Sequence, residues 1–499
     1  MEDRKREDIA LLARAMECRD SLAEFRRERE RCKRFTYGDQ WNDTIEDRGI
    51  KMREHDYIVS QGNMPLKNNL IRRLVRNVLG VYRNQWHTPR CRARDLRETD
   101  DAELMNRLLE HNMERNRLEE LYARSMEEFL ISGMVVHKKW FGRLGPDTDC
   151  RTDLVSPSSF FFDTSSRDFR GGDVTLAGEI HTMRFSELAA TFACKPSDIA
   201  VLRGIYGVPQ GESESAVCVV YEIWERRRPL RLRCRDRRSG RMFTAGADEE
   251  GVIMRENKKR LSRGETALVE TRWVTDEIWR YTFMTPEGVI LRRGDSPYAH
   301  KSHPYVFKAY PYIDGEIHSF VSDIIDQQKL TNRLISMYDW ILRASAKGVL
   351  LFPEGSLPDG ADINDIADEW CRFNGVIVYR PRAGVPLPQQ VSSKSTDIGI
   401  TELLEIQMKM MEDISGVNGA LQGKLDSNSM SGTLYNQQTQ NSLTALADLL
   451  RSFDDFMTDA TAKDISNIRQ YYTPRHIRRA VGVTISMADN QSDAQSVKE

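Results

Sequence analysis

The spacing of apolar residues changes twice along the chain, and this change limits the folds it can adopt. Before about residue 134, and again after residue 311, apolar side chains recur every three or four residues, which is the period of amphipathic helices. Between residues 217 and 310 they gather in short runs rich in Val, Ile, Trp and Tyr, separated by turns, which is typical of strands. The sequence therefore predicts an α+β protein, predominantly helical, with a strand-rich block in mid-chain.

The periodic segments give the expected helices. One begins after Pro65 and ends at Gly80, and another begins at the Asp100-Asp101 cap and extends to Phe129. The remaining predicted helices cover residues 4–34, 317–346, 401–413 and 433–471.

Changes in composition divide the chain into six consecutive regions. They are an N-terminal helical and mixed region (1–216), the strand-rich block (217–310), a long helix (311–352), a second mixed region (353–400), a helix-loop-helix (401–480) and a polar tail (481–499).

Composition excludes some classes of protein. No run approaches the ~18–20 apolar residues of a membrane-spanning helix, so no membrane partner is expected. The N-terminus is charged and has no apolar core, so we expect no signal peptide. The 73 basic and 75 acidic residues give a formal net charge of −2, which argues against a surface that binds nucleic acid everywhere.

The sequence offers no convincing catalytic, metal or cofactor site. Around Gly419 and Gly423 the spacing is one residue too short for a phosphate-binding loop, and Leu425 stands where a hydroxyl is required. The segment after Asp426 resembles a calcium loop but ends in Gln437 instead of a bidentate Glu. We therefore expect no catalytic residue, no metal, no cofactor and no enzymatic activity.

Two polar patterns stand out instead. Nine Arg lie between residues 226 and 241, and strand alternation predicts that Arg231, Arg233 and Arg235 share one face. On the long helix, polar residues four apart form a stripe of uncharged hydrogen-bonding groups: Gln328, Asn332 and Ser336.

The order of several short motifs is also informative. They are Arg34-Phe35, Gly38-Asp39-Gln40-Trp41, Pro65-Leu66 with Asn68 and Asn69, Val78-Leu79-Gly80, Arg83-Asn84, Ser156-Pro157, Phe161-Phe162-Asp163, Tyr221-Glu222-Ile223-Trp224-Glu225, Pro304-Tyr305, Tyr310, Asp314-Gly315, the polar stripe, Ile414-Ser415-Gly416-Val417 and Ser431-Gly432. In this order, over roughly 30–470, the chain resembles a portal protein of tailed, double-stranded DNA bacteriophages, of the short-tailed (P22-like or crAss-like) type.

The resemblance implies a homo-oligomeric ring, typically a dodecamer, at one vertex of the capsid. Double-stranded DNA passes along its axis during packaging and ejection. The terminase docks on the ring during packaging, and tail or adaptor proteins later replace the terminase. The major capsid protein is a further expected partner of the ring. The protein would thus be part of the virion, assembled in the host cytoplasm.

The resemblance also gives the regions and the polar residues expected roles. Wing regions would be 1–216 and 353–400, the clip 217–310, the stem or channel helix 311–352, and the tunnel loop and crown 401–480. Arg231, Arg233 and Arg235 would serve clip docking, and Gln328, Asn332 and Ser336 a subunit interface. The tunnel loop would include Gly423, Lys424, Asn428 and Ser429.

Two other functions remain open from the sequence. A nucleic-acid-processing enzyme could use the basic segments 67–97 and 226–241, but it would need a metal or nucleotide site. Another head–tail connector component of the virion would usually be much smaller, and the long helix 317–346 would then lack a role.

Overall fold

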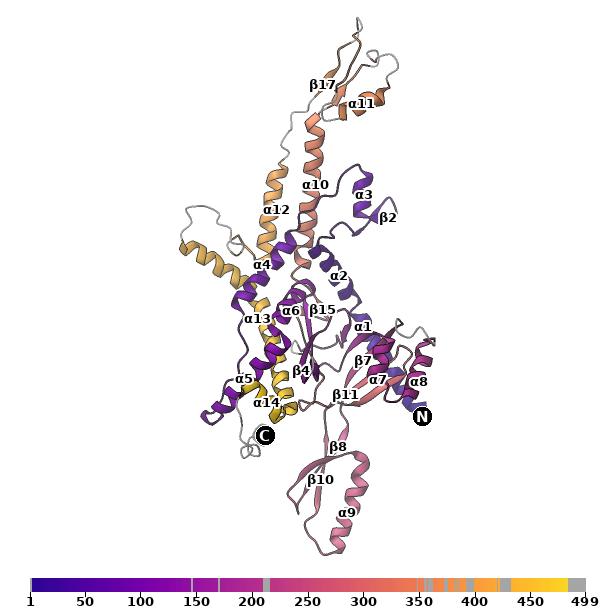
Figure 1. Cartoon of the computed structure of the whole chain (residues 1–499), viewed down its shortest axis with the longest axis vertical. Coiled ribbons are helices and arrows are strands. Elements are labelled where there is room, and N and C mark those ends of the chain that lie inside the picture. The colour runs from indigo at the N-terminus through magenta and orange to yellow at the C-terminus, as the bar shows by residue number, and fades with distance from the viewer. Residues whose placement is uncertain are drawn as a thin grey trace. The chain divides into compact units, whose positions relative to one another are not determined.

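The computed structural model describes residues 2–144, 147–168, 171–209, 216–347, 349–353, 357, 362–371, 376–381, 384, 386–391, 399–419, 421 and 432–482. It is mixed helix and sheet, as the α+β prediction requires (Figure 1). The chain forms two compact units, each assembled from segments distant in sequence. The first contains Met1–Lys33, Val75–Ser322 and Gly423–Glu499, and the second contains Arg34–Leu74 and Asp323–Gln422. The six consecutive regions of the sequence analysis stay a prediction.

The first unit is built on antiparallel sheets. A five-stranded sheet has the order β12-β11-β7-β6-β5, and two three-stranded sheets have the orders β13-β3-β4 and β10-β8-β9. The strands are β3 (Met134–Leu144), β4 (Asp147–Leu154), β5 (Phe160–Phe162), β6 (Leu176–Arg184), β7 (Val217–Arg227), β8 (Leu230–Asp236), β9 (Met242–Ala245), β10 (Val269–Thr275), β11 (Ile278–Met284), β12 (Ile290–Asp295) and β13 (Tyr305–Ala309), with a hairpin of β14 (Tyr312–Ile313) and β15 (Glu316–Ile317).

The first unit also contains helices. They are α1 (Glu2–Ser21), α2 (Ala23–Tyr37), α4 (Leu70–Gln85), α5 (Thr99–Asn116), α6 (Leu118–Ser132), α7 (Phe185–Phe192), α8 (Pro196–Tyr206), α9 (Glu250–Ser262), α13 (Gly432–Tyr471) and α14 (Pro474–Val481), with α2 and α4 extending into the second unit. Of these helices, α1, α5, α6, α7 and α13 pack against the strands. The main core joins α1 to the sheets through Phe161, Trp224 and Tyr305, because alternating strand residues point inward there. Short 3-10 helices are Leu96–Glu98, Ala247–Glu249 and Ser322–Ile324.

The second unit is mainly helical. Its elements are β1 (Thr44–Asp47), β2 (Ile50–Arg53), α3 (Glu54–Ser60), α10 (Ile325–Lys347), β16 (Val349–Leu351), α11 (Ile363–Cys371), β17 (Gln389–Val391) and α12 (Ile400–Ser415). Helices α10 and α12 lie side by side (Figure 1). Strand β16, which follows α10, pairs with β17, which precedes α12. The predicted helices 401–413 and 433–471 are confirmed as α12 and α13.

Three predicted helices begin, end or are interrupted at other residues in the structure. The predicted helix 4–34 is interrupted at Leu22, where α1 gives way to α2. The predicted end at Gly80 is wrong, since α4 continues to Gln85. A glycine inside a helix costs only ~1 kcal/mol, and Val78 and Tyr82 on either side of it are buried. At Arg117 a φ of 50° separates α5 from α6, a break that the apolar pattern did not reveal.

The long helix and the strand-rich block also differ from their predictions. The expected helix 317–346 begins only at Ile325, after β15 and a 3-10 turn. Helix α9 lies within the predicted strand block 217–310. Little in the sequence indicates α9, because Ile253 is its one buried residue and half of its other positions are charged. Burying a single apolar position does not produce a helical period.

Candidate functional site

Strands β8, β9 and β10 form a small sheet that is covered on one face by α9 (Figure 1). Leu232 and Cys234 of β8 point into this small core together with Ile253 of α9. Because strand side chains alternate, the predicted residues Arg231, Arg233 and Arg235 lie on the other face. That face is therefore lined by arginine.

The charge on this arginine face is only partly neutralised. Arg231 lies 3.8 Å from Asp276 and 3.9 Å from Asp295, at the limit of an ion pair. Arg233 stands directly opposite Arg272 of β10 in the strand register, and such facing like charges are destabilising. Within the described part of the chain, Arg233 and Arg272 make no ion pair, and neither does Arg235. The face presents guanidinium groups that are available to an acidic partner.

The polar stripe on α10 lies inside the second unit. The side chains of Gln328, Asn332 and Ser336 are all buried. Three hydrogen bonds join them to the segment that leads into α4 and to its first residue. The N–H of Leu70 donates to Gln328 Oε1 at 2.9 Å, that of Asn68 to Asn332 Oδ1 at 3.1 Å, and that of Leu66 to Ser336 Oγ at 3.0 Å.

The remaining polar atoms of the stripe also have partners in the chain. Gln328 Nε2 donates to the carbonyl of Asn68 at 2.7 Å, and Asn332 Nδ2 donates to Gln40 Oε1 at 2.7 Å. The sequence predicted that this stripe meets a neighbouring subunit, whereas here its hydrogen bonds lie within one chain. The subunit contact stays a prediction, and the stripe has a second role that the sequence did not indicate. The other predicted set, Gly423, Lys424, Asn428 and Ser429, lies outside the described residues.

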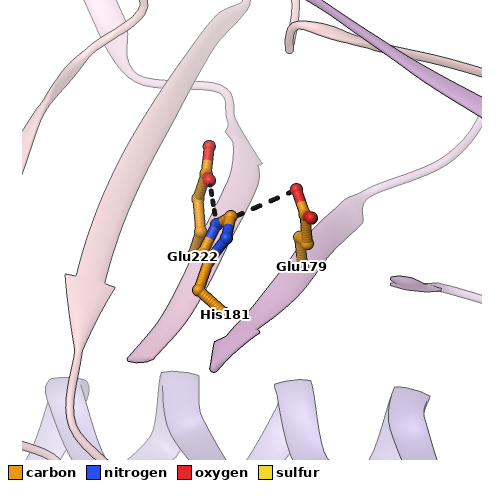
Figure 2. A group of neighbouring side chains, drawn as sticks. All are labelled: Glu179, His181 and Glu222. Carbon is orange, nitrogen blue, oxygen red and sulfur yellow. Dashed lines mark hydrogen bonds and ion pairs between the residues drawn. The ribbon is translucent and has the colours of Figure 1, made fainter. Parts of the chain in front are cut away.

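A cluster of ionisable side chains lies on the neighbouring strands β6 and β7, with Glu222 buried and Glu179 and His181 partly buried. Figure 2 shows His181 between Glu222 and Glu179, with His181 Nε2 2.6 Å from Glu222 Oε2 and 3.8 Å from Glu179 Oε2. The three potential ligand atoms all lie within 4.8 Å of one another, a spacing that a metal ion could bridge. A lysine on β3, a strand of another sheet, shows whether a metal ion could bind here.

Lys138 of β3 supplies the cation of this cluster. Its Nζ lies 2.5 Å from Glu222 Oε2 and 3.6 Å from Glu179 Oε2, while Trp224 Nε1 donates to Glu222 Oε1 at 2.9 Å. The ammonium group therefore stands where a metal would have to bind, and both oxygens of Glu222 are in use. We conclude that the cluster is an ion-pair network.

The network shifts the pKa of its members. Burial acts to raise the pKa of Glu222, but the Lys138 charge and the His181 hydrogen bond outweigh it and bring this pKa well below its ordinary value. Burial acts to lower the pKa of Lys138, but the charges of Glu222 and Glu179 raise it overall. For Glu179 burial dominates, so its pKa is raised. The pair Lys138–Glu222 is therefore held in its charged form.

This network could not be predicted from local sequence patterns. Glu222 is one residue of the Tyr221–Glu225 motif, and Lys138 lies 84 positions away along the chain. A charged residue inside an apolar strand was the one available signal, since such residues are rarely buried without a partner.

The family model that describes phage P22-like portal proteins matches residues 12–487 of the chain, nearly its whole length. The chain belongs to the phage P22-like portal protein family. Among curated proteins, none matches. Membership makes this a portal protein of a bacteriophage, with a role in DNA packaging and in connecting head to tail. Portal proteins are structural components of the virion at a capsid vertex and form oligomeric rings. Of the described helices, none has the length and apolar character needed to span a membrane.

Proposed function

We propose that twelve copies of this chain form a ring at one capsid vertex, and that double-stranded DNA enters and leaves through its axis. The family match over residues 12–487 carries this proposal. The net charge of −2 supports it, because each phosphate that a channel neutralises adds counterion-release affinity and slows passage. The ring is assembled in the host cytoplasm before it becomes part of the virion.

The ring acts as a passive conduit, and the terminase supplies ATP hydrolysis. The terminase docks on the arginine face of the β8-β9-β10 sheet, and a tail or adaptor protein takes its place after packaging. Arg233 and Arg235, which are exposed and make no ion pair with any residue that the structure describes, support this assignment, because guanidinium groups bind carboxylates in a bidentate manner.

The segment around Lys424 lines the channel. Gly423, Asn428 and Ser429 give it backbone freedom and uncharged polar contacts. In a ring, one Lys424 per subunit would form a circle of positive charge, screened within ~8 Å at physiological salt. Such a circle steadies DNA without trapping it.

Negative-stain microscopy of the purified protein tests the main proposal. We expect rings with a central hole, and native mass spectrometry should give a mass of twelve subunits. A compact monomer with nuclease or ATPase turnover, abolished by substituting one residue cluster, would instead support a nucleic-acid-processing enzyme. A ring of another size would refute only the subunit number.

A further inference from the structure

Two arginines oppose each other on neighbouring strands of the arginine face. Arg233 of β8 and Arg272 of β10 are direct partners in the antiparallel register, so their Cβ atoms lie about 4.5–5.5 Å apart on the same side of the sheet. Both side chains are exposed, and neither forms an ion pair with any residue that the structure describes. The two charges repel each other, and an anion held between them would replace this repulsion with attraction.

Arg235 continues the positive row along β8. It lies two residues beyond Arg233 on the same side of the strand, about 6.8 Å away, and it is exposed without an ion pair among the described residues. The acidic residue opposite it, Glu270, is paired with Arg237 instead. Arg233, Arg235 and Arg272 therefore form a group of guanidinium groups with no counter-charge in the described part of the chain.

The chemistry of this group suits carboxylates. A guanidinium group is a flat fork of N–H donors that binds both oxygens of a carboxylate together. One carboxylate has about four lone-pair sites, enough to accept from Arg233 and Arg272 at once. A second carboxylate about 6.8 Å further along would meet Arg235, and this is the distance between alternate side chains of an extended chain.

The surroundings of the group favour a short acidic segment over a nucleic acid. Asp276 and Asp295 lie beside Arg231 at one end of the row, and Glu270 lies at the other end. A phosphate backbone carries its charges without a break, so these carboxylates would repel it. The residues of β9 and β10 on this side of the sheet also include no aromatic ring on which a base could stack; they are Met242, Thr244, Glu270, Arg272 and Val274.

We propose that Arg233 and Arg272 clamp one carboxylate of an extended acidic segment, and that Arg235 binds the carboxylate two residues further along this segment. The inference rests on the proposed docking role of the arginine face and names the chemistry of the partner, which carries acidic residues at alternate positions. It also adds Arg272 of β10 to the docking residues. Single ion pairs at exposed positions are weak, so the contact depends on the shared carboxylate.

Two peptides of equal length and composition test the spacing. Both contain only Glu and Thr, because Thr favours extended chains. One alternates Glu and Thr, and the other repeats Glu-Glu-Thr-Thr, so that no two of its carboxylates are two residues apart. Fluorescence anisotropy with the full-length wild-type protein should show about tenfold tighter binding of the alternating peptide. Equal affinities, or tighter binding of the other peptide, would refute the spacing. Tighter binding of a thymidine oligonucleotide of equal charge would assign the face to nucleic acid and overturn the proposal.

A double-mutant cycle tests the clamp. Arg233→Ala and Arg272→Ala should each weaken binding of the alternating peptide by about tenfold, and the double variant should lose far less than the product, because both side chains bind one carboxylate. Without peptide, either variant should unfold at the same or a higher urea concentration than wild type, since a repulsion is removed. Arg255→Ala, exposed on α9 at the other face of the sheet, is the matched control and should bind as wild type. Losses that multiply would show that the two arginines act separately and would refute the clamp.

The clamp and the docking role fail in different ways. Loss of terminase docking on reversing the arginine face, with no preference between the two peptides, would refute the clamp and leave the docking role standing. Terminase docking that persists in Arg233→Ala/Arg272→Ala, while the alternating peptide no longer binds, would refute the docking role and leave the clamp standing.

Discussion

The Oε1 atom of Gln328 accepts hydrogen bonds from the backbone N–H groups of Leu70 and Ile71, at 2.9 and 3.2 Å. Helix α4 begins at Leu70, and the first N–H groups of a helix have no partner within it. Asn69, just before the helix, accepts a hydrogen bond from the N–H of Arg72 at 3.0 Å, and Gln328 of α10 caps the two preceding amides. The start of α4 is thus capped by two side chains, one of which belongs to the stripe on α10.

Gln328→Leu should destabilise the protein by about 1–3 kcal/mol, because it leaves the buried N–H of Ile71 without an acceptor and the N–H of Leu70 with only the carbonyl of Asn68. The urea midpoint of unfolding should fall, and hydrogen exchange at Leu70 and Ile71 should become faster. Gln437→Leu, at an exposed position of α13, is the matched control and should change neither quantity. Unchanged exchange at Ile71 in the Gln328 variant would show that the cap contributes nothing.

Asn332→Leu separates the two roles of the stripe. It removes the acceptor for Asn68 N–H and the donor to Gln40, so the isolated subunit should lose about 1–3 kcal/mol. If Asn332 also contacts a neighbouring subunit, dissociation of the ring should shift by more than subunit unfolding does. Equal ring stability in wild type and variant would count against the predicted interface.

Reversing the arginine face should impair docking. In the variant Arg231→Glu/Arg233→Glu/Arg235→Glu we expect loss of terminase binding and of DNA packaging, since an acidic partner would be repelled. The matched control is Arg255→Glu/Lys258→Glu/Lys259→Glu. It makes the same charge change at three exposed positions of α9, the helix that covers the other face of the same sheet. Normal packaging in the first variant, or equal loss in both, would refute the assignment.

Deleting residues 424–430 tests the channel role of the loop. Rings should still form, because the deletion spares α12 and α13. Retention of packaged DNA should fall, which nuclease protection of the genome in filled heads would measure. Lys424→Gln should give a smaller loss of the same kind if the charge itself matters. A full, stably held genome in the deletion variant would exclude this segment as the constriction.

The ion-pair network should make stability depend on pH. The pKa of Glu222 in the folded protein lies below its ordinary value, so its stabilising contribution is complete above the unfolded pKa of about 4.3. This contribution is lost as the pH falls from there through the lower, folded pKa. The urea midpoint of wild type should therefore drop in acid, and Glu222→Gln should drop less.

At pH 7 the same variant should be less stable by about 3–5 kcal/mol, because Lys138 loses its nearest buried counter-charge. Glu405→Gln removes an exposed carboxylate and should behave as wild type at either pH. Parallel pH profiles for wild type and Glu222→Gln would show that another group governs the acid transition.

The sequence predicted those elements whose burial follows one simple period. Helices α12 and α13 were found nearly to the residue, and the alternation of β8 placed Arg231, Arg233 and Arg235 correctly on one face. The sequence did not predict where helices are interrupted. The left-handed backbone at Arg117 and the continuous helix through Gly80 both depend on packing against distant segments.

The site contacts are non-local, which is why the sequence could not reveal them. Gln328 meets Leu70 across 258 positions, and no local pattern announces which amides a polar stripe will serve. The stripe itself was visible, but its partners were not. In the same way, Lys138 and Glu222 become a pair only once β3 lies near β7.

The hydrogen bonds between α10 and the start of α4 follow a regular order along both segments. Polar residues four apart on a helix are separated by about 6 Å along its axis. Ser336, Asn332 and Gln328 accept from the N–H groups of Leu66, Asn68 and Leu70 in turn, so every second residue of the segment meets one turn of α10. An inserted or deleted residue in this segment would misalign the amides on one side of the change. The length of this segment is therefore constrained by the spacing of the polar residues on α10.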